Sequence, residues 1–206
     1  MLSDSAGRSP SLGHVTSSIL GAVLAGGRST RMGQDKANVL VRGSTMLETV
    51  ASAVHPVTDR VIVLGPDRDG WECWPDSVHA QGPLAGVATA LNRTETDHIL
   101  LVAVDHPFVT TATLTHLVNK ADGLPVVPVD DHGIRQVTCA IYPKSIAEAA
   151  TEEARSGGSV QSLLDRVSFT AVTADTWRGW GEDGRSWFSA DDPKTLSEGL
   201  AHFQAS

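Results

Sequence analysis

Three short apolar runs, each followed by glycine or aspartate, place the strongest constraint on how this 206-residue chain can fold. They are residues 19–25, 60–64 and 99–104, and none of them alternates between polar and apolar positions. Such runs are typical of strands buried on both faces of a parallel sheet. Apolar residues at helical spacing follow each run, within residues 45–54, 84–91 and 113–120. The order strand, helix, strand, helix, strand predicts an α/β fold, with a mostly parallel, Rossmann-like sheet in a three-layer domain.

The second half of the chain is less regular. Residues 125–129 (PVVPV) are strand-like but carry two prolines, which predicts an edge strand. Residues 136–142 alternate, with Val137, Cys139 and Ile141 on one side. This pattern predicts a half-buried antiparallel strand in the C-terminal half, with Cys139 in the core. The remaining expected elements are a strand at 169–172 and helices at 146–154, 160–166 and 196–203.

The composition favours one globular domain. Hydrophobic residues make up 41% of the chain and charged residues 19%, and a chain of this length can bury a core of its own. No internal repeat or long linker divides it. We therefore predict a flexible tail at residues 1–17, which are rich in Ser and Gly and hold no apolar secretory segment, and one domain at residues 18–206.

Charge and cysteine content exclude several classes of protein. Lys and Arg number 16 against 24 Asp and Glu, so the formal net charge is −8. This balance argues against broad binding of nucleic acid or of a membrane surface, and no apolar run approaches the roughly 18 residues of a membrane span. Cys73 and Cys139 form neither a CxxC pair nor a disulfide framework, which indicates plain thiols and a cytoplasmic protein.

A glycine-rich loop with three cations is the first candidate site. Residues 24–37 read LAGGRSTRMGQDKA. Gly26 and Gly27, at the end of a strand, let backbone N–H groups approach an anion closely. Three cations follow within nine residues: Arg28, Arg31 and Lys36. A polyphosphate is the simplest ligand that needs such a loop, and the competing interpretation is a glycine turn with solvated charges. The P-loop and the dinucleotide fingerprint both fail to match, the P-loop because Gly27 stands at its lysine position.

The loop as a whole resembles the signature LAGGxSxRMGxDKA of the MobA-type nucleotidyltransferases, whose best-known members are the molybdenum cofactor guanylyltransferases, and every fixed position matches. Residues 82–86 (GPLAG) and 105–108 (DHPF) look like two more segments of this family. Residues 131–142 (DHGIRQVTCAIY) are similar to its DGxxQPLxAxY strand, and residues 187–193 to its F-x-N/D-x-N/D-T-P segment. The resemblance covers residues 19–203, nearly the whole chain.

The resemblance implies a nucleotide site and a metal site. It assigns catalysis to Arg31, Lys36 and Asp105. The residues that it implies for nucleotide binding are Leu24, Ala25, Gly26, Gly27, Lys36, Asp76, Gly82 and Asp105. Asp105 directly follows a buried strand, where open α/β sheets bind their ligands, and Mg²⁺ needs only one or two carboxylates. Asp191 is a second, weaker candidate for the metal; otherwise it belongs to the N-cap region of the closing helix.

Some positions depart from the family pattern. Gly158 stands where the family often has a basic residue, so a contact to an anionic acceptor is missing there. Ser189 and Asp192 replace an Asn/Asp and a Thr of the family segment. Trp177 and Trp180 lie in a stretch with no clear counterpart, and they either pack locally or flank a flat pterin.

The resemblance implies an enzyme that transfers GMP from GTP to the phosphate of molybdopterin and releases pyrophosphate. Because the acceptor phosphate is ionised near neutral pH, it can attack the α-phosphorus without a covalent enzyme intermediate. The alternatives are a molybdopterin cytidylyltransferase, another NTP:phosphate nucleotidyltransferase of the same fold, or a non-catalytic carrier of GTP or cofactor. The expected partners are GTP, a molybdopterin-type cofactor and, by transient contact, molybdenum cofactor enzymes or insertion factors. Nothing in the sequence indicates the oligomeric state.

Overall fold

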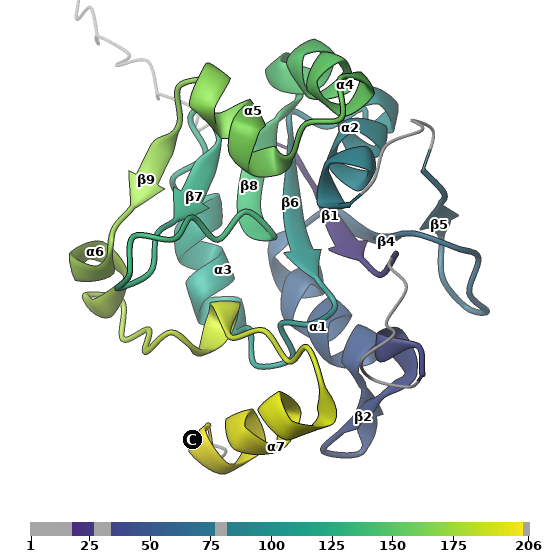
Figure 1. The fold of residues 1–206 in the computed structure, drawn as a ribbon, viewed down its shortest axis with the longest axis vertical. Coiled ribbons are helices and arrows are strands. Elements are labelled where there is room, and N and C mark those ends of the chain that lie inside the picture. The colour runs from purple at the N-terminus through teal and green to yellow at the C-terminus, as the bar shows by residue number, and fades with distance from the viewer. Residues whose placement is uncertain (1–17, 27–33, 77–81, 204–206) are drawn as a thin grey trace, which may run out of the picture.

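One seven-stranded sheet runs through the middle of the molecule (Figure 1). The structure is a computed structural model that describes residues 18–26, 34–76 and 82–203, so the predicted tail at residues 1–17 lies outside the described chain. The strand order in the sheet is β5-β4-β1-β6-β8-β7-β9. The strands are β1 (Ile19–Leu24), β4 (Arg60–Leu64), β5 (Cys73–Trp74), β6 (His98–Ala103), β7 (Val126–Pro128), β8 (Cys139–Pro143) and β9 (Thr170–Val172).

Helices lie on both faces of this sheet, which confirms the predicted three-layer α/β fold (Figure 1). The α-helices are α1 (Met46–Val54), α2 (Pro83–Arg93), α3 (Thr111–Val118), α4 (Ala147–Arg155), α5 (Val160–Arg166), α6 (Ala174–Arg178) and α7 (Pro193–His202). The short elements are the hairpin of β2 (Leu40–Val41) and β3 (Ser44–Thr45) and the 3-10 helices η1 (Lys36–Asn38), η2 (His55–Val57), η3 (Lys144–Ile146) and η4 (Arg185–Trp187). Within the described chain, no helix is long and apolar enough to cross a membrane.

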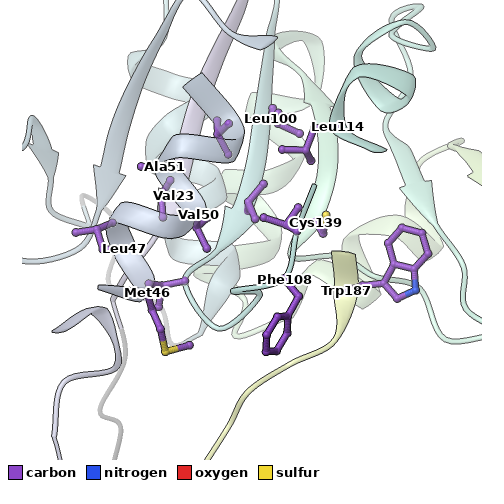
Figure 2. Packing of buried hydrophobic residues seen from close by; sticks show 14 of the residues in the cluster. Val23, Met46, Leu47, Val50, Ala51, Leu100, Phe108, Leu114, Cys139 and Trp187 are labelled. Carbon is purple, nitrogen blue, oxygen red and sulfur yellow. The ribbon is translucent and has the colours of Figure 1, made fainter. Parts of the chain in front are cut away.

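Each face of the sheet has its own hydrophobic cluster. Side chains of α1 and α3 pack on one face, where Val50 and Leu114 contact the strands through residues such as Leu100 (Figure 2). Side chains of α2, α4 and α5 pack on the other face, against residues such as Leu20 and Leu101. Because both faces are covered, the central strands β1 and β6 contain no polar residue except His98, the first residue of β6, as the unbroken runs predicted.

The centre of the sheet is parallel. β1 pairs with β4 on one side and with β6 on the other, both in parallel. Gly21 in β1 allows α1 to approach closely, because a Cβ there would lie 2.6 Å from Cγ1 of Val54. The helix itself begins at a capping box, in which the Thr45 hydroxyl accepts from the backbone of Glu48 and the Glu48 carboxylate accepts from the backbone of Thr45.

The antiparallel strand β8 was predicted correctly in direction and incorrectly in exposure. It pairs antiparallel with β6 and β7, and Cys139 is buried as predicted. Burial raises the pKa of the Cys139 thiol to about 12. The strand is not half-buried, because Ala140 and Tyr142 are fully buried under the helices of the other face. It begins at Cys139, so Val137 lies in the preceding turn and packs against the opposite cluster.

The prediction that residues 125–129 form an edge strand is wrong. β7 lies between β8 and β9, and the edges of the sheet are β5 and β9. The two prolines are tolerated because Pro125 precedes the strand and Pro128 ends it. The pairing continues around them: Pro128 O accepts from the Gln136 N–H at 2.8 Å, and the Val129 N–H donates to Val172 O at 2.9 Å.

Candidate active site

The carboxyl ends of β1 and β6 lie side by side. Leu24 pairs with Ala103, and the Val104 N–H donates to Leu24 O at 2.9 Å. In Figure 1 the β6 arrow points toward the end of the molecule that carries α7 and the β2 hairpin. A pocket of about 220 Å³ opens there, and its lining comprises Leu24, Ala25, Gly26, Asp35, Lys36, Pro83, Ala103, Val104, Asp105 and Thr138. Ligands of open α/β sheets bind at this edge.

Lys36 lies between two carboxylates in this pocket. Its Nζ donates to Asp191 Oδ1 at 2.7 Å and to Asp105 Oδ2 at 3.4 Å. The Lys36 side chain is only 18% exposed. Lys36 is the first residue of the 3-10 helix η1, and Asp35 is the N-cap of that helix. The Asp35 side chain accepts a hydrogen bond from the Ala37 N–H at 3.0 Å. The local turn therefore fixes the direction in which the lysine leaves the backbone.

Asp105 and Asp191 are brought together by a backbone contact. Asp105 lies two residues after the end of β6, and its carbonyl accepts from the Ala190 N–H at 2.8 Å. The N-cap of α7 is Asp192, whose Oδ1 accepts from the Thr195 N–H at 2.8 Å. Asp192, and not Asp191, is therefore the residue that caps α7. The Asp191 carboxylate instead accepts a hydrogen bond from Lys36.

Arg68, which sequence reasoning missed, ties the ends of the glycine-rich loop together. It follows β4 and is 11% exposed. Its Nη1 donates to Asp35 Oδ2 at 2.7 Å, and its Nη2 donates to Ala25 O at 3.0 Å. Burial raises the pKa of Asp35, but the hydrogen bonds from Arg68 and Ala37 outweigh it and hold that pKa below its ordinary value. An arginine between Asp67 and Asp69 in a loop carries no sequence signal for this role.

Comparison with known proteins shows which family this chain belongs to. The sequence model described as the MobA-like NTP transferase domain matches residues 21–171. The chain belongs to this family. A relative from Pelotomaculum thermopropionicum, named a probable molybdenum cofactor guanylyltransferase, is 30% identical over 183 residues, which are 85% of this chain and 89% of that protein. As the sequence predicted, the chain is a nucleotidyltransferase.

Solved structures of lower identity support the fold alone. Molybdopterin-guanine dinucleotide biosynthesis protein A from Archaeoglobus fulgidus aligns with a TM-score of 0.78 at 22% identity. The alignment covers 91% of this chain and 100% of that chain. The 2-C-methyl-D-erythritol 4-phosphate cytidylyltransferase from Thermus thermophilus aligns with a TM-score of 0.64 at 18% identity, over 90% of this chain and 98% of that one. The nucleotidyltransferase fold therefore serves proteins named for different bases.

The donors of this nucleotidyltransferase site fit a divalent metal of the magnesium type. Asp105 and Asp191 offer two hard carboxylate oxygens around one cation, the Lys36 ammonium, and Mg²⁺ is commonly held by one or two carboxylates with phosphate oxygens and water. Across the residues that the structure describes, no cluster of three or more His, Cys, Asp or Glu could hold a metal ion.

The remaining predicted residues divide into three groups. Leu24, Ala25 and Gly26, which the sequence predicts to bind the nucleotide, are part of the pocket lining. Gly27 and Arg31 lie outside the described residues. Asp76 and Gly82 are described but are not part of the pocket lining, which α2 reaches through Pro83. Desolvation raises the pKa of Asp76.

The departure from the family pattern at Gly158 has a structural reason. A Cβ at Gly158 would lie 2.0 Å from Glu153 Oε1. Glu153 is held in place because it accepts from Ser162 Oγ at 2.6 Å and from Arg166 Nη1 at 2.6 Å. A basic side chain at position 158 would therefore clash with Glu153.

The tryptophans of this nucleotidyltransferase pack locally, which agrees with the simpler of the two interpretations. Trp177 is buried, and its Nε1 donates to Val129 O at 2.9 Å. Its ring meets Trp187 edge-on at 5.2 Å between centroids. Trp180 stacks on His116 with centroids 4.7 Å apart. Neither Trp177 nor Trp180 is part of the pocket lining.

Proposed function

We propose that this nucleotidyltransferase transfers GMP from GTP to the phosphate of molybdopterin, with release of pyrophosphate and formation of the guanine dinucleotide cofactor. The observation that carries the proposal is the position of Lys36 between Asp105 and Asp191 where β1 and β6 end. A cation and two carboxylates at this edge are what transfer of a nucleotidyl group requires for charge neutralisation. The choice of GTP and molybdopterin is supported by the name of the Pelotomaculum relative, which the chain matches over 89% of its length.

The reaction needs positioning more than acid–base chemistry. An oxygen of the ionised acceptor phosphate forms a bond to the α-phosphorus of GTP, and the bond from that phosphorus to the bridging oxygen breaks as pyrophosphate leaves. The backbone of residues 24–26 would hold the nucleotide, because these residues line the pocket and neither Ala25 nor Gly26 has a bulky side chain. Lys36 and, as a proposal from the sequence, Arg31 would neutralise the phosphates during transfer.

Asp105 and Asp191 are the residues that we propose hold Mg²⁺. The bound ion would supply neutralisation of the triphosphate charge during displacement. The two carboxylates approach each other from the end of β6 and from the segment before α7. The contact between Asp105 O and the Ala190 N–H keeps these two segments together before any ligand binds.

The proposal is tested by measuring pyrophosphate release from purified protein with Mg²⁺ and molybdopterin, with GTP and CTP supplied separately. Release with GTP alone is expected. Release with CTP alone would keep the reaction class and replace the product with a cytosine dinucleotide. Release with neither, despite measurable GTP binding, would contradict the proposal and favour the carrier alternative. Release that persists after chelation of divalent ions would contradict the metal assignment.

We also propose a cytoplasmic location and a direct transfer of the product to molybdenum cofactor enzymes or insertion factors. The support for the location is that Cys73 and Cys139 are both free thiols, as in proteins kept reduced. The support for direct transfer is chemical, since a labile pterin benefits from passing between proteins without release. Cell fractionation and crosslinking in cells test these two statements separately.

A further inference from the structure

A polar pair that the proposed reaction does not use lies against the active-site pocket. Thr138 lines the pocket together with Lys36 and Asp105, and its Oγ1 lies 3.0 Å from Nε2 of His106. His106 is 3% exposed. Burying the imidazole of His106 costs free energy that an apolar side chain of the same shape would avoid, and the partly exposed Thr138 is its hydrogen-bonding partner. We therefore expect this pair to have a function at the pocket.

Neither residue of the pair is specified by the family motifs. His106 fills the variable position of D-x-P, and Thr138 stands where the DGxxQPLxAxY strand has leucine. A leucine would offer the pocket no hydrogen-bonding group, whereas threonine adds a hydroxyl. The imidazole behind it gives that hydroxyl a fixed partner.

The backbone holds both residues against the end of β6. Thr138 O accepts from the Ala103 N–H at 2.8 Å, and the His106 N–H donates to Ala103 O at 3.1 Å. Because the two residues are anchored on the same strand residue, the Thr138 hydroxyl has a fixed position relative to Asp105. A group held in this way loses little entropy when it binds a ligand.

Asp105 determines which atom of the pair carries the shared hydrogen. Its Oδ1 lies 3.8 Å from Nε2 of His106, and a negative charge favours a hydrogen on the ring nitrogen that faces it. The other ring nitrogen, Nδ1, is buried and has no hydrogen-bond partner in the described part of the chain, so a hydrogen there would stay unsatisfied. We therefore assign the hydrogen to Nε2, which donates to Thr138 Oγ1 whether the ring carries one proton or two. The threonine O–H is left to donate into the pocket.

We propose that the Thr138 hydroxyl donates a hydrogen bond to a phosphate oxygen of the bound substrate, and that His106 is the positioning residue that orients it. This inference rests on the proposed function, because that reaction brings a nucleotide phosphate and an acceptor phosphate to one pocket. An anionic oxygen suits this place, because Lys36 faces the same pocket and the proposed Mg²⁺ would offset the charges of its two carboxylate partners. Hydrogen bonds to charged acceptors are also the strong ones.

The test compares Thr138→Val, which keeps the shape and removes the hydroxyl, with Thr138→Ser, which keeps the hydroxyl. Calorimetry gives the affinity for GTP with Mg²⁺ in the absence of acceptor, and the affinity for molybdopterin in the absence of nucleotide. Thr138→Val is expected to weaken at least one affinity by about tenfold to a hundredfold, and Thr138→Ser by less than about threefold. A loss of GTP affinity assigns the contact to the nucleotide, and a loss of molybdopterin affinity assigns it to the acceptor.

Variants of His106 test the positioning role. His106→Leu is expected to reproduce the effect of Thr138→Val, and His106→Gln to retain most of the affinity, because a glutamine N–H can replace Nε2–H. The double variant that combines His106→Gln with Thr138→Val should bind no worse than Thr138→Val alone, since His106 acts through the hydroxyl. Thr151→Val is the matched control, because its hydroxyl donates to Ala147 O on α4 and Thr151 is not in the pocket lining.

Two results would overturn the proposal. One is a Thr138→Val protein with both affinities unchanged. The other is a Thr138→Val protein whose losses are not relieved in Thr138→Ser and are matched by an equal drop in melting temperature, since that pattern means a structural role. A wild-type protein that binds both ligands and releases no pyrophosphate contradicts the proposed function alone, because the binding measurements still decide the role of Thr138.

Discussion

Lys36 Nζ lies 2.7 Å from Asp191 Oδ1, although 155 positions separate the two residues in the chain. The contact joins the 3-10 helix after the glycine-rich loop to the segment that leads into α7. The Ala190 N–H reinforces it by donating to the carbonyl of Asp105. The C-terminal segment is therefore part of a site whose other residues follow the first and third runs of the sequence, and changes near α7 are expected to alter catalysis as well as stability.

We expect Lys36→Ala and Asp105→Ala each to lose at least about a hundredfold in turnover. Each variant removes a charge that acts on the transferring phosphate, and one such group commonly contributes about 3–4 kcal/mol of transition-state stabilisation. Turnover is measured at saturating Mg²⁺ and GTP, so that weaker binding does not account for the loss. Arg28→Ala is the comparison variant and should be milder, because that position varies in the motif. A near-normal rate in either variant would show that its assigned role is wrong.

Variants of the neighbouring residues Asp191 and Asp192 are expected to change different properties: turnover in the first case and melting temperature in the second. Asp191→Asn should lower turnover by about tenfold or more, because the ion pair with Lys36 is lost. Asp192→Ala should lower the melting temperature, because the N-cap of α7 is lost, and should keep the turnover per folded molecule. Circular dichroism melting and pyrophosphate release on both variants provide the comparison. The reverse assignment of the two effects would contradict this description of the site.

Arg68→Met is expected to raise the KM for GTP by roughly tenfold to a hundredfold, because displacing a nucleotide by a fraction of an ångström is costly to a positioned reaction. The arginine holds Asp35 and the carbonyl of Ala25 at the two ends of the glycine-rich loop. Lysine cannot make both contacts at once, so Arg68→Lys should recover only part of the effect. Arg60→Met is the matched control, since its ion pair with Glu72 is half exposed and such pairs contribute little. Equal KM values for the two methionine variants would contradict the positioning role.

The sequence predicted best what is determined locally. The three apolar runs became β1, β4 and β6, because a strand covered on both faces is apolar at nearly every position. The polar exceptions are Arg60 and His98, the first residues of β4 and β6. Residues 136–142 were misjudged, because alternation indicates two faces and does not reveal that helices cover both of them. The prolines at 125 and 128 suggested that β7 is an edge strand. The edge on that side of the sheet is instead β9, which comes from a segment more than 40 positions later in the chain.

The residues of the candidate site also differ in whether the sequence could predict them. Lys36 and Asp105 were predictable, because each lies in a motif next to a strand end. Arg68 and Thr138 were not, because their roles come from contacts with residues distant in sequence: Arg68 with Ala25 and Asp35, and Thr138 with His106. No local pattern marks an arginine or a threonine of this kind, and only the folded arrangement of the sheet places Thr138 in the pocket lining and Arg68 against the lining residues Ala25 and Asp35.

The buried imidazole of His98 is expected to make folding stability depend on pH. His98 begins β6 and is 5% exposed, and neither ring nitrogen has a hydrogen-bond partner in the described part of the chain. Burial lowers its pKa below the ordinary value of 6.5, against the opposing charges of Asp97 and Asp122. Above pH 6.5 both the folded and the unfolded chain keep this ring neutral, so its contribution is fully present. As the pH falls below 6.5, the unfolded chain takes up a proton that the folded chain resists, and stability is lost.

The measurement is urea unfolding at pH 7.5 and pH 5.5 for the wild type and for His98→Leu. The wild type should lose more free energy of unfolding than the variant over this interval, by no more than the limit for one proton, about 1.4 kcal/mol per pH unit. His106, whose pKa burial also lowers, is present in both proteins, so its contribution cancels in the comparison. Identical losses in the two proteins would mean that His98 takes up its proton equally well in the folded and unfolded chains.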